Sequence, residues 1–139
     1  MTPISASAAK EQPLTTDDLI EERVSALIGR ACRRQLWLLF LDAEDVQLPI
    51  LMPTDDFPVS PLPEYARALA RGVSEILEAT DAAQVILVWE RYAGAELTAG
   101  DRAWARQLHD ECTESGVRVR AQLLSHKRGV RWIAPEDYR

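Results

Sequence analysis

The sequence is poor in the residues from which metal sites and disulfides are built. Only two cysteines and two histidines occur among its 139 residues. Cys32 and Cys112 each fall in a predicted helix beside apolar residues, a position typical of a small buried side chain. His109 and His126 stand beside charged neighbours, which favours polar roles at the surface. We therefore expect no metal site, no disulfide and no cofactor.

Long apolar runs are missing as well. No stretch approaches the roughly 20 apolar residues of a membrane-spanning helix. Residues 1–12 lack the basic start and the apolar stretch of a secretory signal. These absences predict a cytoplasmic protein without membrane contact. Arginine outnumbers lysine by 14 to 2, which is typical of a GC-rich bacterial genome.

Positive charge is scarce relative to negative charge. The chain has 16 Lys/Arg against 22 Asp/Glu and a formal net charge of −6. Such an acidic balance argues against a general nucleic-acid-binding protein. The imbalance is not uniform, because residues 102–139 hold 8 Lys/Arg against 5 Asp/Glu. A local basic face near the C-terminus therefore stays open.

Apolar side chains are abundant. They make up 47% of the sequence, and a chain of this length with that composition buries a core as one ordinary domain. Residues 1–14 contain two prolines and no apolar periodicity, so we expect a flexible N-terminal arm there. Residues 15–139 are expected to form the single α/β domain.

Apolar periodicity divides residues 15–139 into eight elements. Helical spacing predicts three helices, and short apolar or alternating runs predict five strands. Pro49 removes one ladder donor and so places its strand at an edge or a bulge. The predicted fold is a single three-layer-like α/β domain whose mixed sheet of about five strands carries packed helices, in the order α-β-β-α-β-α-β-β. The helices cover 15–32, 63–77 and 98–116, and the strands cover 36–41, 46–52, 84–90, 117–125 and 130–134.

The loop from residue 88 to 101 lies where an α/β sheet usually builds a site, between the end of a strand and the start of a helix. Its candidate site residues are Glu90, Glu96, Thr98 and Asp101. Thr98 and Asp101 have the spacing of a capping box, in which both side chains satisfy backbone donors. We interpret Glu90 and Glu96 as solvated loop carboxylates. An acid–base pair is the alternative, and it requires convergence and shifted pKa values.

The order of elements over about residues 35–134 resembles the JAB/MPN metalloprotease-like fold, in particular its RadC-like bacterial branch. The same strand, Gly-containing loop, Thr-x-x-Asp and helix carry the resemblance. It implies a His-x-His pair at the strand end, an upstream Glu, and Ser-x-x-Asp at the helix start, where this chain has Thr98 and Asp101.

The histidines that the resemblance implies are absent in both possible registers. Strict spacing puts their positions at Val88 and Glu90, and a loop one residue shorter puts them at Trp89 and Arg91. A catalytic zinc needs three protein ligands and an open water position. The resemblance therefore implies a degenerate domain without the hydrolytic activity of the family.

Five basic residues lie on the last two predicted strands and their turn. Gathered on one face, they would form an anion-attracting patch. Charged side chains on exposed strands also prevent edge-to-edge aggregation, and edge protection is the simpler interpretation. The five residues are Arg118, Arg120, Lys127, Arg128 and Arg131.

The sequence assigns no catalytic residue. We expect a non-catalytic α/β domain that acts as a protein-interaction or regulatory module, through a protein partner or self-association, because the first predicted helix carries an apolar face that must be covered. One alternative is a hydrolase with a non-standard carboxylate site in the 88–101 loop. Another is anion or nucleic-acid binding through the C-terminal arginines, which predicts steep salt dependence.

Overall fold

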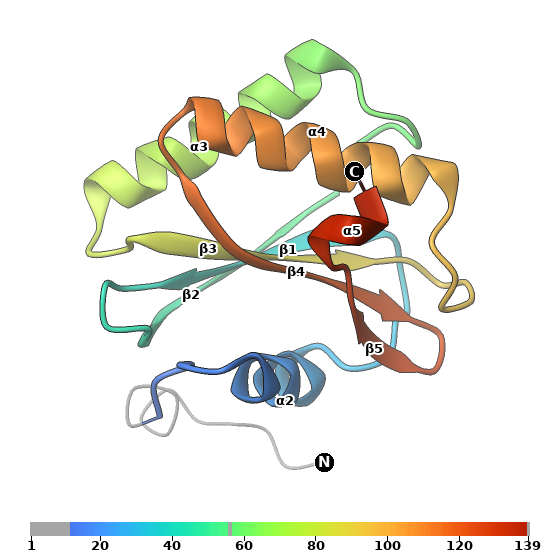
Figure 1. Ribbon diagram of the computed structural model, residues 1–139, viewed down its shortest axis with the longest axis horizontal. Coiled ribbons are helices and arrows are strands. Elements are labelled where there is room, and N and C mark those ends of the chain that lie inside the picture. Colours follow the sequence, from blue (N-terminus) through green and yellow to red (C-terminus); the bar gives the residue numbers. More distant parts are fainter. Residues whose placement is uncertain (1–11, 56, 139) are drawn as a thin grey trace.

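The computed structural model describes residues 12–55 and 57–138, and its five strands form one mixed sheet (Figure 1). The strand order across the sheet is β2-β1-β3-β4-β5. The predicted fold class and element order are confirmed, with one short helix added after the last strand. The strands are β1 (Gln35–Leu41), β2 (Gln47–Thr54), β3 (Gln84–Glu90), β4 (Arg118–His126) and β5 (Gly129–Trp132); the helices are α2 (Asp17–Leu27), α3 (Pro63–Ala79), α4 (Ala99–Glu114) and α5 (Pro135–Tyr138).

The pairing of the strands fixes where the loops meet. β1 pairs antiparallel with β2 and with β3, and β4 forms an antiparallel hairpin with β5. β3 and β4 are parallel and are connected through α4, as a parallel pair requires. Glu90 at the end of β3 stands beside Ser125 of β4. The β3–α4 loop and the β4–β5 hairpin therefore lie at the same end of the sheet.

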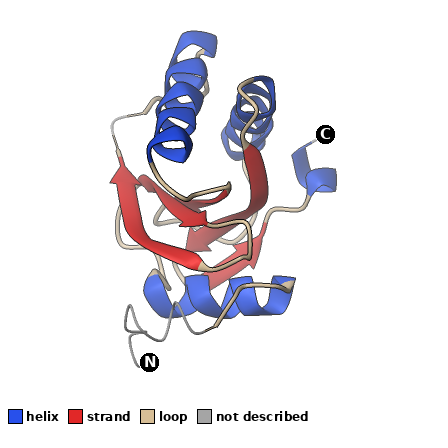
Figure 2. Cartoon of the chain, turned by 90° about the vertical axis from the view of Figure 1, so that its left-hand side faces the viewer, coloured by secondary structure: helices blue, strands red, loops and turns tan. Residues whose placement is uncertain are grey.

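Helices cover both faces of the sheet (Figures 1 and 2). α3 and α4 lie on one face, and α2 lies on the other. Along β1, Leu36, Leu38 and Phe40 join the core under α3 and α4. Leu39 and Leu41 point the opposite way and join the core around α2. A strand buried on both faces is apolar at successive positions, which is why the uninterrupted apolar run predicted this arrangement.

The first helix is shorter than the sequence predicts. Its N-cap is Thr16 rather than Thr15, because Thr16 Oγ1 accepts a hydrogen bond from the Leu19 N–H. α2 ends at Leu27, and Gly29 follows with a φ of 65°. This left-handed conformation is common just beyond helix ends and suits glycine.

The two cysteines differ in environment. Cys32 lies beyond the end of α2 and is exposed, so the prediction of a helical, buried thiol is wrong for this residue. The early end of α2 is the cause. Cys112 lies in α4 and is buried as predicted, and burial raises the pKa of its thiol to about 12.

The folded part of the chain begins before residue 15. Residues 1–11 of the predicted arm lie outside the described residues. Leu14 is fully buried in the core around α2, and its N–H donates to the Asp45 carbonyl at 2.8 Å. Within residues 12–55 and 57–138, no helix has both the length and the apolar character needed to cross a membrane.

Candidate functional site

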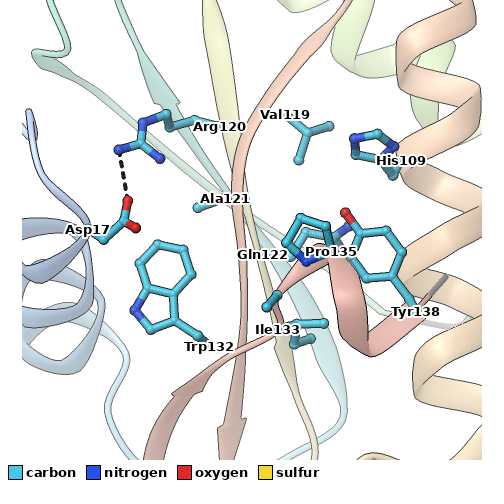
Figure 3. Close-up of a pocket in the computed structure, with 11 residues that line it drawn as sticks. Asp17, His109, Val119, Arg120, Ala121, Gln122, Trp132, Ile133, Pro135 and Tyr138 are labelled. Carbon is cyan, nitrogen blue, oxygen red and sulfur yellow. Dashed lines mark hydrogen bonds and ion pairs between the residues drawn. The ribbon is translucent and has the colours of Figure 1, made fainter.

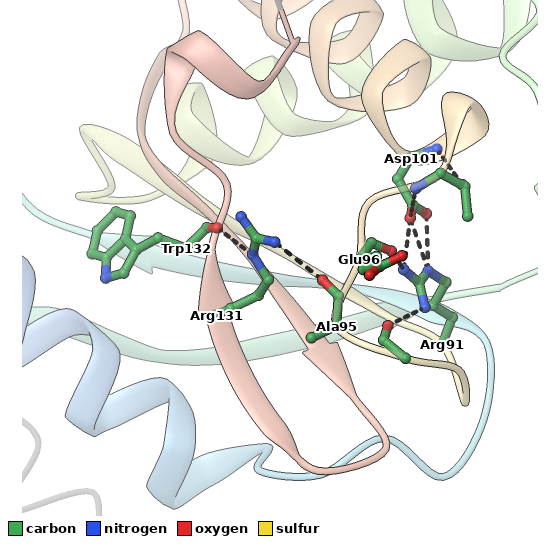
Figure 4. A network of polar contacts seen from close by, with 8 residues as sticks. Arg91, Ala95, Glu96, Asp101, Arg131 and Trp132 are labelled. Atoms are coloured by element: carbon green, nitrogen blue, oxygen red, sulfur yellow. Dashed lines mark hydrogen bonds and ion pairs between the residues drawn. The ribbon is translucent and has the colours of Figure 1, made fainter.

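Arg91, the first residue after β3, holds the β3–α4 loop in place (Figure 4). Its Nε donates to both carboxylate oxygens of Asp101 at 3.0 Å, and its Nη2 donates to Oδ2 at 2.8 Å. The same guanidinium donates to the carbonyls of Gly94 (2.9 Å) and Glu96 (2.7 Å). A planar group with five N–H donors suits several acceptors at once. The donors of the Arg91 guanidinium are thus used by atoms of the loop that it holds in place.

The predicted capping box at the start of α4 is confirmed. Thr98 Oγ1 accepts from the Asp101 N–H at 3.1 Å, and Asp101 Oδ2 accepts from the Thr98 N–H at 2.8 Å. Burial alone would raise the pKa of Asp101, but the bonds from Arg91 and Thr98 lower it below its ordinary value. Asp101 is therefore an anion bound to Arg91 and to the helix start. Glu96 is exposed and contributes its backbone carbonyl to this network.

Glu90 is buried, with 3% of its surface exposed, and the prediction of a solvated carboxylate is wrong for this residue. Its Oε2 accepts from the backbone N–H groups of Cys32 (2.7 Å) and Arg33 (3.1 Å). Its Oε1 accepts from Gln35 Nε2 and Trp37 Nε1, each at 2.8 Å. Burial opposes ionisation, yet these four donors lower the pKa of Glu90 to about 2. The carboxylate anchors the segment that enters β1.

The carboxylates of Glu90 and Asp101 belong to separate networks. Both residues border a pocket of about 190 Å³. However, Trp89 precedes Glu90 in β3, and its ring belongs to the core under α3 and α4. Because successive side chains of a strand point to opposite faces, the Glu90 side chain points toward the α2 face. Asp101 lies on the α4 side and binds Arg91. In the described part of the chain, no group of three or more His, Cys, Asp or Glu side chains is arranged to hold a metal ion.

The five C-terminal basic residues form two groups rather than one patch. Arg118 opens β4, and Arg120 binds Asp17 of α2 at 3.0 Å. Lys127 and Arg128 are exposed in the β4–β5 turn, and Arg131 lies on β5. At about 3.3 Å per residue, the eight steps from Arg118 to His126 span roughly 26 Å. A single anion-attracting patch, the alternative to edge protection, would therefore have to extend over most of the length of β4, with Arg131 opposite Leu124.

Arg131 belongs to the hairpin group and is already engaged (Figure 4). Its Nε donates to the Trp132 carbonyl at 3.0 Å, and its Nη1 donates to the Ala95 carbonyl at 3.1 Å. It also forms an ion pair with Asp137 at 3.5 Å. Like Arg91, it ties the β3–α4 loop to its surroundings.

The two histidines occupy different environments. His126, at the end of β4, is 8% exposed, so the prediction of a surface role is wrong for it. Burial lowers the pKa of His126, and the neighbouring positive charges of Arg91, Arg131 and Arg128 lower it further. His109 lies on α4, and its side chain is 38% exposed.

The outer edge of β4 is covered over only part of its length. β4 has nine residues and β5 has four, and their pairing runs from Leu123 to His126. The Ile133 N–H adds one bond to the Gln122 carbonyl at 2.9 Å before the chain turns into α5. In the part of the chain that the structure describes, Arg118–Ala121 has β3 as its only neighbouring strand.

A groove of about 390 Å³ lies along this uncovered edge (Figure 3). One wall, on the α4 side, includes His109 and Tyr138, whose rings are 5.8 Å apart. The other wall, on the α2 side, includes Asp17 and Trp132. Sequence reasoning missed this groove, although the unequal lengths of the last two predicted strands, 117–125 and 130–134, signalled an edge that one strand could not cover.

The structure thus brings Arg91, Thr98 and Asp101 together, and it separates Glu90 and the basic residues of early β4 from them. The chain matches no model of a known protein family, and a search of curated proteins finds nothing similar to it. We call residues 88–101 the stapled loop, and we call the groove along Val119–Gln122 of β4 the β4 groove.

Proposed function

We propose that this domain is a non-catalytic protein-interaction module that binds a segment of a partner protein in the β4 groove. The single observation that carries the proposal is the uncovered half of β4 at the floor of a groove with apolar and charged walls. An edge strand presents unpaired N–H and C=O groups, which are a template for pairing with another chain. An exposed groove of this kind suits a peptide segment.

The carboxylates of the stapled loop support the proposal that the domain is non-catalytic. A general acid or base has to be free to exchange a proton near neutral pH. Glu90, with its pKa lowered to about 2, and Asp101, with a lowered pKa, stay ionised in that range. Their oxygens already accept bonds from the protein itself. The alternative of a carboxylate-based hydrolase would require both networks to break.

We further propose that the domain is a degenerate JAB/MPN-type domain of a cytoplasmic bacterial protein. In the shorter of the two loop registers, Arg91 takes a position where the resemblance implies a metal-ligating histidine. Arg91 binds Asp101, the residue at the position of the implied Asp ligand. A guanidinium would then supply, as a fixed part of the chain, the positive charge that stabilises this loop.

Selection from a random peptide library tests the proposed function. The library is displayed on phage and selected on the wild-type protein and on two variants. His109→Trp places a larger ring in the β4 groove, whereas Gln107→Trp adds the same ring elsewhere on α4. We expect the same peptides to be enriched on the wild type and on Gln107→Trp and to be lost on His109→Trp. No enrichment, or equal enrichment on all three proteins, would contradict the proposal.

A further inference from the structure

We propose that the segment bound in the β4 groove is an extended strand of a partner protein in which carboxylate side chains alternate with apolar ones. This inference rests on the proposed function and specifies the chemistry of the partner. The bound strand would lie beside Arg118–Ala121, continuing the line of β5, and would complete the outer edge of the sheet.

Backbone pairing favours an extended occupant. β5 covers β4 only from Leu123 onward, and the Gln122 carbonyl takes the last bond, from Ile133. The remaining residues, Arg118–Ala121, have no strand on their outer side. The register of β4 with β3 shifts between Val119 and Ala121, so this stretch contains a bulge and only part of it offers regularly spaced backbone groups to one more strand. Main-chain bonds give such strand addition its affinity, and the pockets for alternate side chains give it specificity.

The α2 side of the groove selects carboxylates. Arg120 directs its guanidinium to this side, toward Asp17 (Figure 3). Arg118 lies just beyond the residues that line the groove. It precedes the register shift between Val119 and Ala121, and because Val119 between the two arginines faces the α4 side, Arg118 shares the α2 face with Arg120. Arg118 is exposed and has no ion-pair partner in residues 12–55 and 57–138. Residues opposite each other on paired strands share a face. Carboxylates two positions apart in the partner would thus meet Arg118 and Arg120.

The α4 side of the groove selects apolar side chains. Val119 lies between the two arginines and packs with the core under α4. Ile133, Pro135 and Tyr138 continue this wall (Figure 3). A partner residue between two carboxylates would point to this side and cover Val119. The two walls together specify an acid, apolar, acid pattern.

The charges disfavour a second copy of this chain as the occupant. In an antiparallel pair of two β4 edges centred on Val119, Arg118 of one copy would face Arg120 of the other. Like charges directly opposite each other destabilise a strand pair. The other edge of the sheet, β2, contains Pro49 and Pro53, which lack N–H donors. Neither edge of this chain matches the β4 edge.

Three labelled peptides of ten residues test the inference by fluorescence polarisation. In the glutamate peptide, valine alternates with glutamate. In the lysine peptide, lysine replaces each glutamate, and in the threonine peptide, threonine replaces each glutamate. We expect the wild-type protein to bind the glutamate peptide most tightly and the lysine peptide most weakly. Arg118→Glu should weaken binding of the glutamate peptide about tenfold, because it replaces an attraction with a repulsion and exposed pairs are each worth roughly two- to fivefold. Arg71→Glu, the same change on an exposed residue of α3, should leave binding unchanged.

Asp17 gives a variant with the opposite effect. Its side chain is 68% exposed and competes with the partner for Arg120. Asp17→Asn should strengthen binding of the glutamate peptide about two- to fivefold, while Asp18→Asn, its exposed neighbour in α2, should have less effect. Equal effects of the two variants would mean that binding responds only to the net charge of the surface. That result would overturn the conclusion that Arg120 contacts a carboxylate of the partner.

The failure of this inference differs from a failure of the proposed function. Equal binding of the glutamate and threonine peptides, lost in His109→Trp, would overturn the charge pattern and leave the β4 groove as the binding site. Binding that His109→Trp does not change would overturn both. If none of the three peptides binds, the acid and apolar pattern is wrong, and the library selection decides the proposed function. If light scattering shows that the wild-type protein is a dimer and that the Arg118→Glu variant is a monomer, the occupant of the groove is a second copy of this chain. That result would overturn the choice of a different protein as the partner.

Discussion

The stapled loop and the β4 groove both carry charged residues at the periphery of the sheet, but they differ in what those residues do. In the stapled loop, Arg91 and Asp101 bind each other and the backbone around them. At the β4 groove, Arg120 binds Asp17, but Arg118 beside the groove has no ion-pair partner in the described residues, and the outer edge of Arg118–Ala121 has no neighbouring strand there. A charged side chain therefore indicates a binding site only where its capacity for hydrogen bonds and ion pairs is not already used within the protein.

The largest effect is expected at Glu90, whose carboxylate accepts four hydrogen bonds. Glu90→Ala should lower the free energy of unfolding by about 4 kcal/mol, because it leaves buried donors unpaired. Glu90→Gln keeps the shape and should cost about half as much. Urea denaturation followed by tryptophan fluorescence measures both. A loss below about 1 kcal/mol for Glu90→Ala would mean that this end of the sheet is not held as described.

The pH dependence of stability provides a second test of the same carboxylate. Because folding lowers the pKa of Glu90 from its ordinary value of 4.5 to about 2, its contribution is complete above about pH 5 and is lost as the pH falls toward 2. The full contribution is about 3 kcal/mol. We expect the stability difference between the wild type and Glu90→Gln to shrink over this range. A constant difference from pH 6 to pH 3 would contradict the lowered pKa.

The Arg91–Asp101 pair should contribute less. Arg91→Ala and Asp101→Asn should each cost about 2 kcal/mol, and a double-mutant cycle should give a coupling energy of about 1 to 2 kcal/mol. Hydrogen exchange of residues 92–97 should accelerate in both variants, because the loop loses its staple. Arg102→Ala, on the exposed side of α4, serves as the control. Additive effects of the two changes would refute the described network.

The smallest effect concerns the reactivity of Cys32. Its hydrogen bond with Glu90, together with the negative charge of that carboxylate, raises the pKa of the Cys32 thiol. Glu90→Gln should therefore lower this pKa and speed labelling of Cys32 by a thiol reagent at pH 7.5. The buried Cys112 reports on unfolding in the same experiment. Unchanged Cys32 labelling, with Cys112 protected, would show that Glu90 does not control this thiol.

Much of the fold followed from local pattern. The apolar runs of β1 and β3 predicted strands buried on both faces, and the Thr98 to Asp101 spacing predicted the capping box. Glu90 was harder, because its donors come from residues 53 to 58 positions away along the chain. Such contacts depend on strand register, which local periodicity does not determine.

The β4 groove lay beyond sequence reasoning for a related reason. Its floor could be expected from the excess length of β4 over β5. Its walls could not, because α2 and α4 meet the edge from opposite faces of the sheet. The short helix α5, which brings Tyr138 beside His109, also has no periodic signal of its own.

Hydrogen exchange with and without the alternating valine and glutamate peptide tests the contrast between the two regions most directly. Our prediction is that saturating peptide slows hydrogen exchange in residues 118–122 and leaves exchange in residues 91–97 unchanged. Protection of residues 91–97 without protection of residues 118–122 would contradict it, because the site would then be the stapled loop.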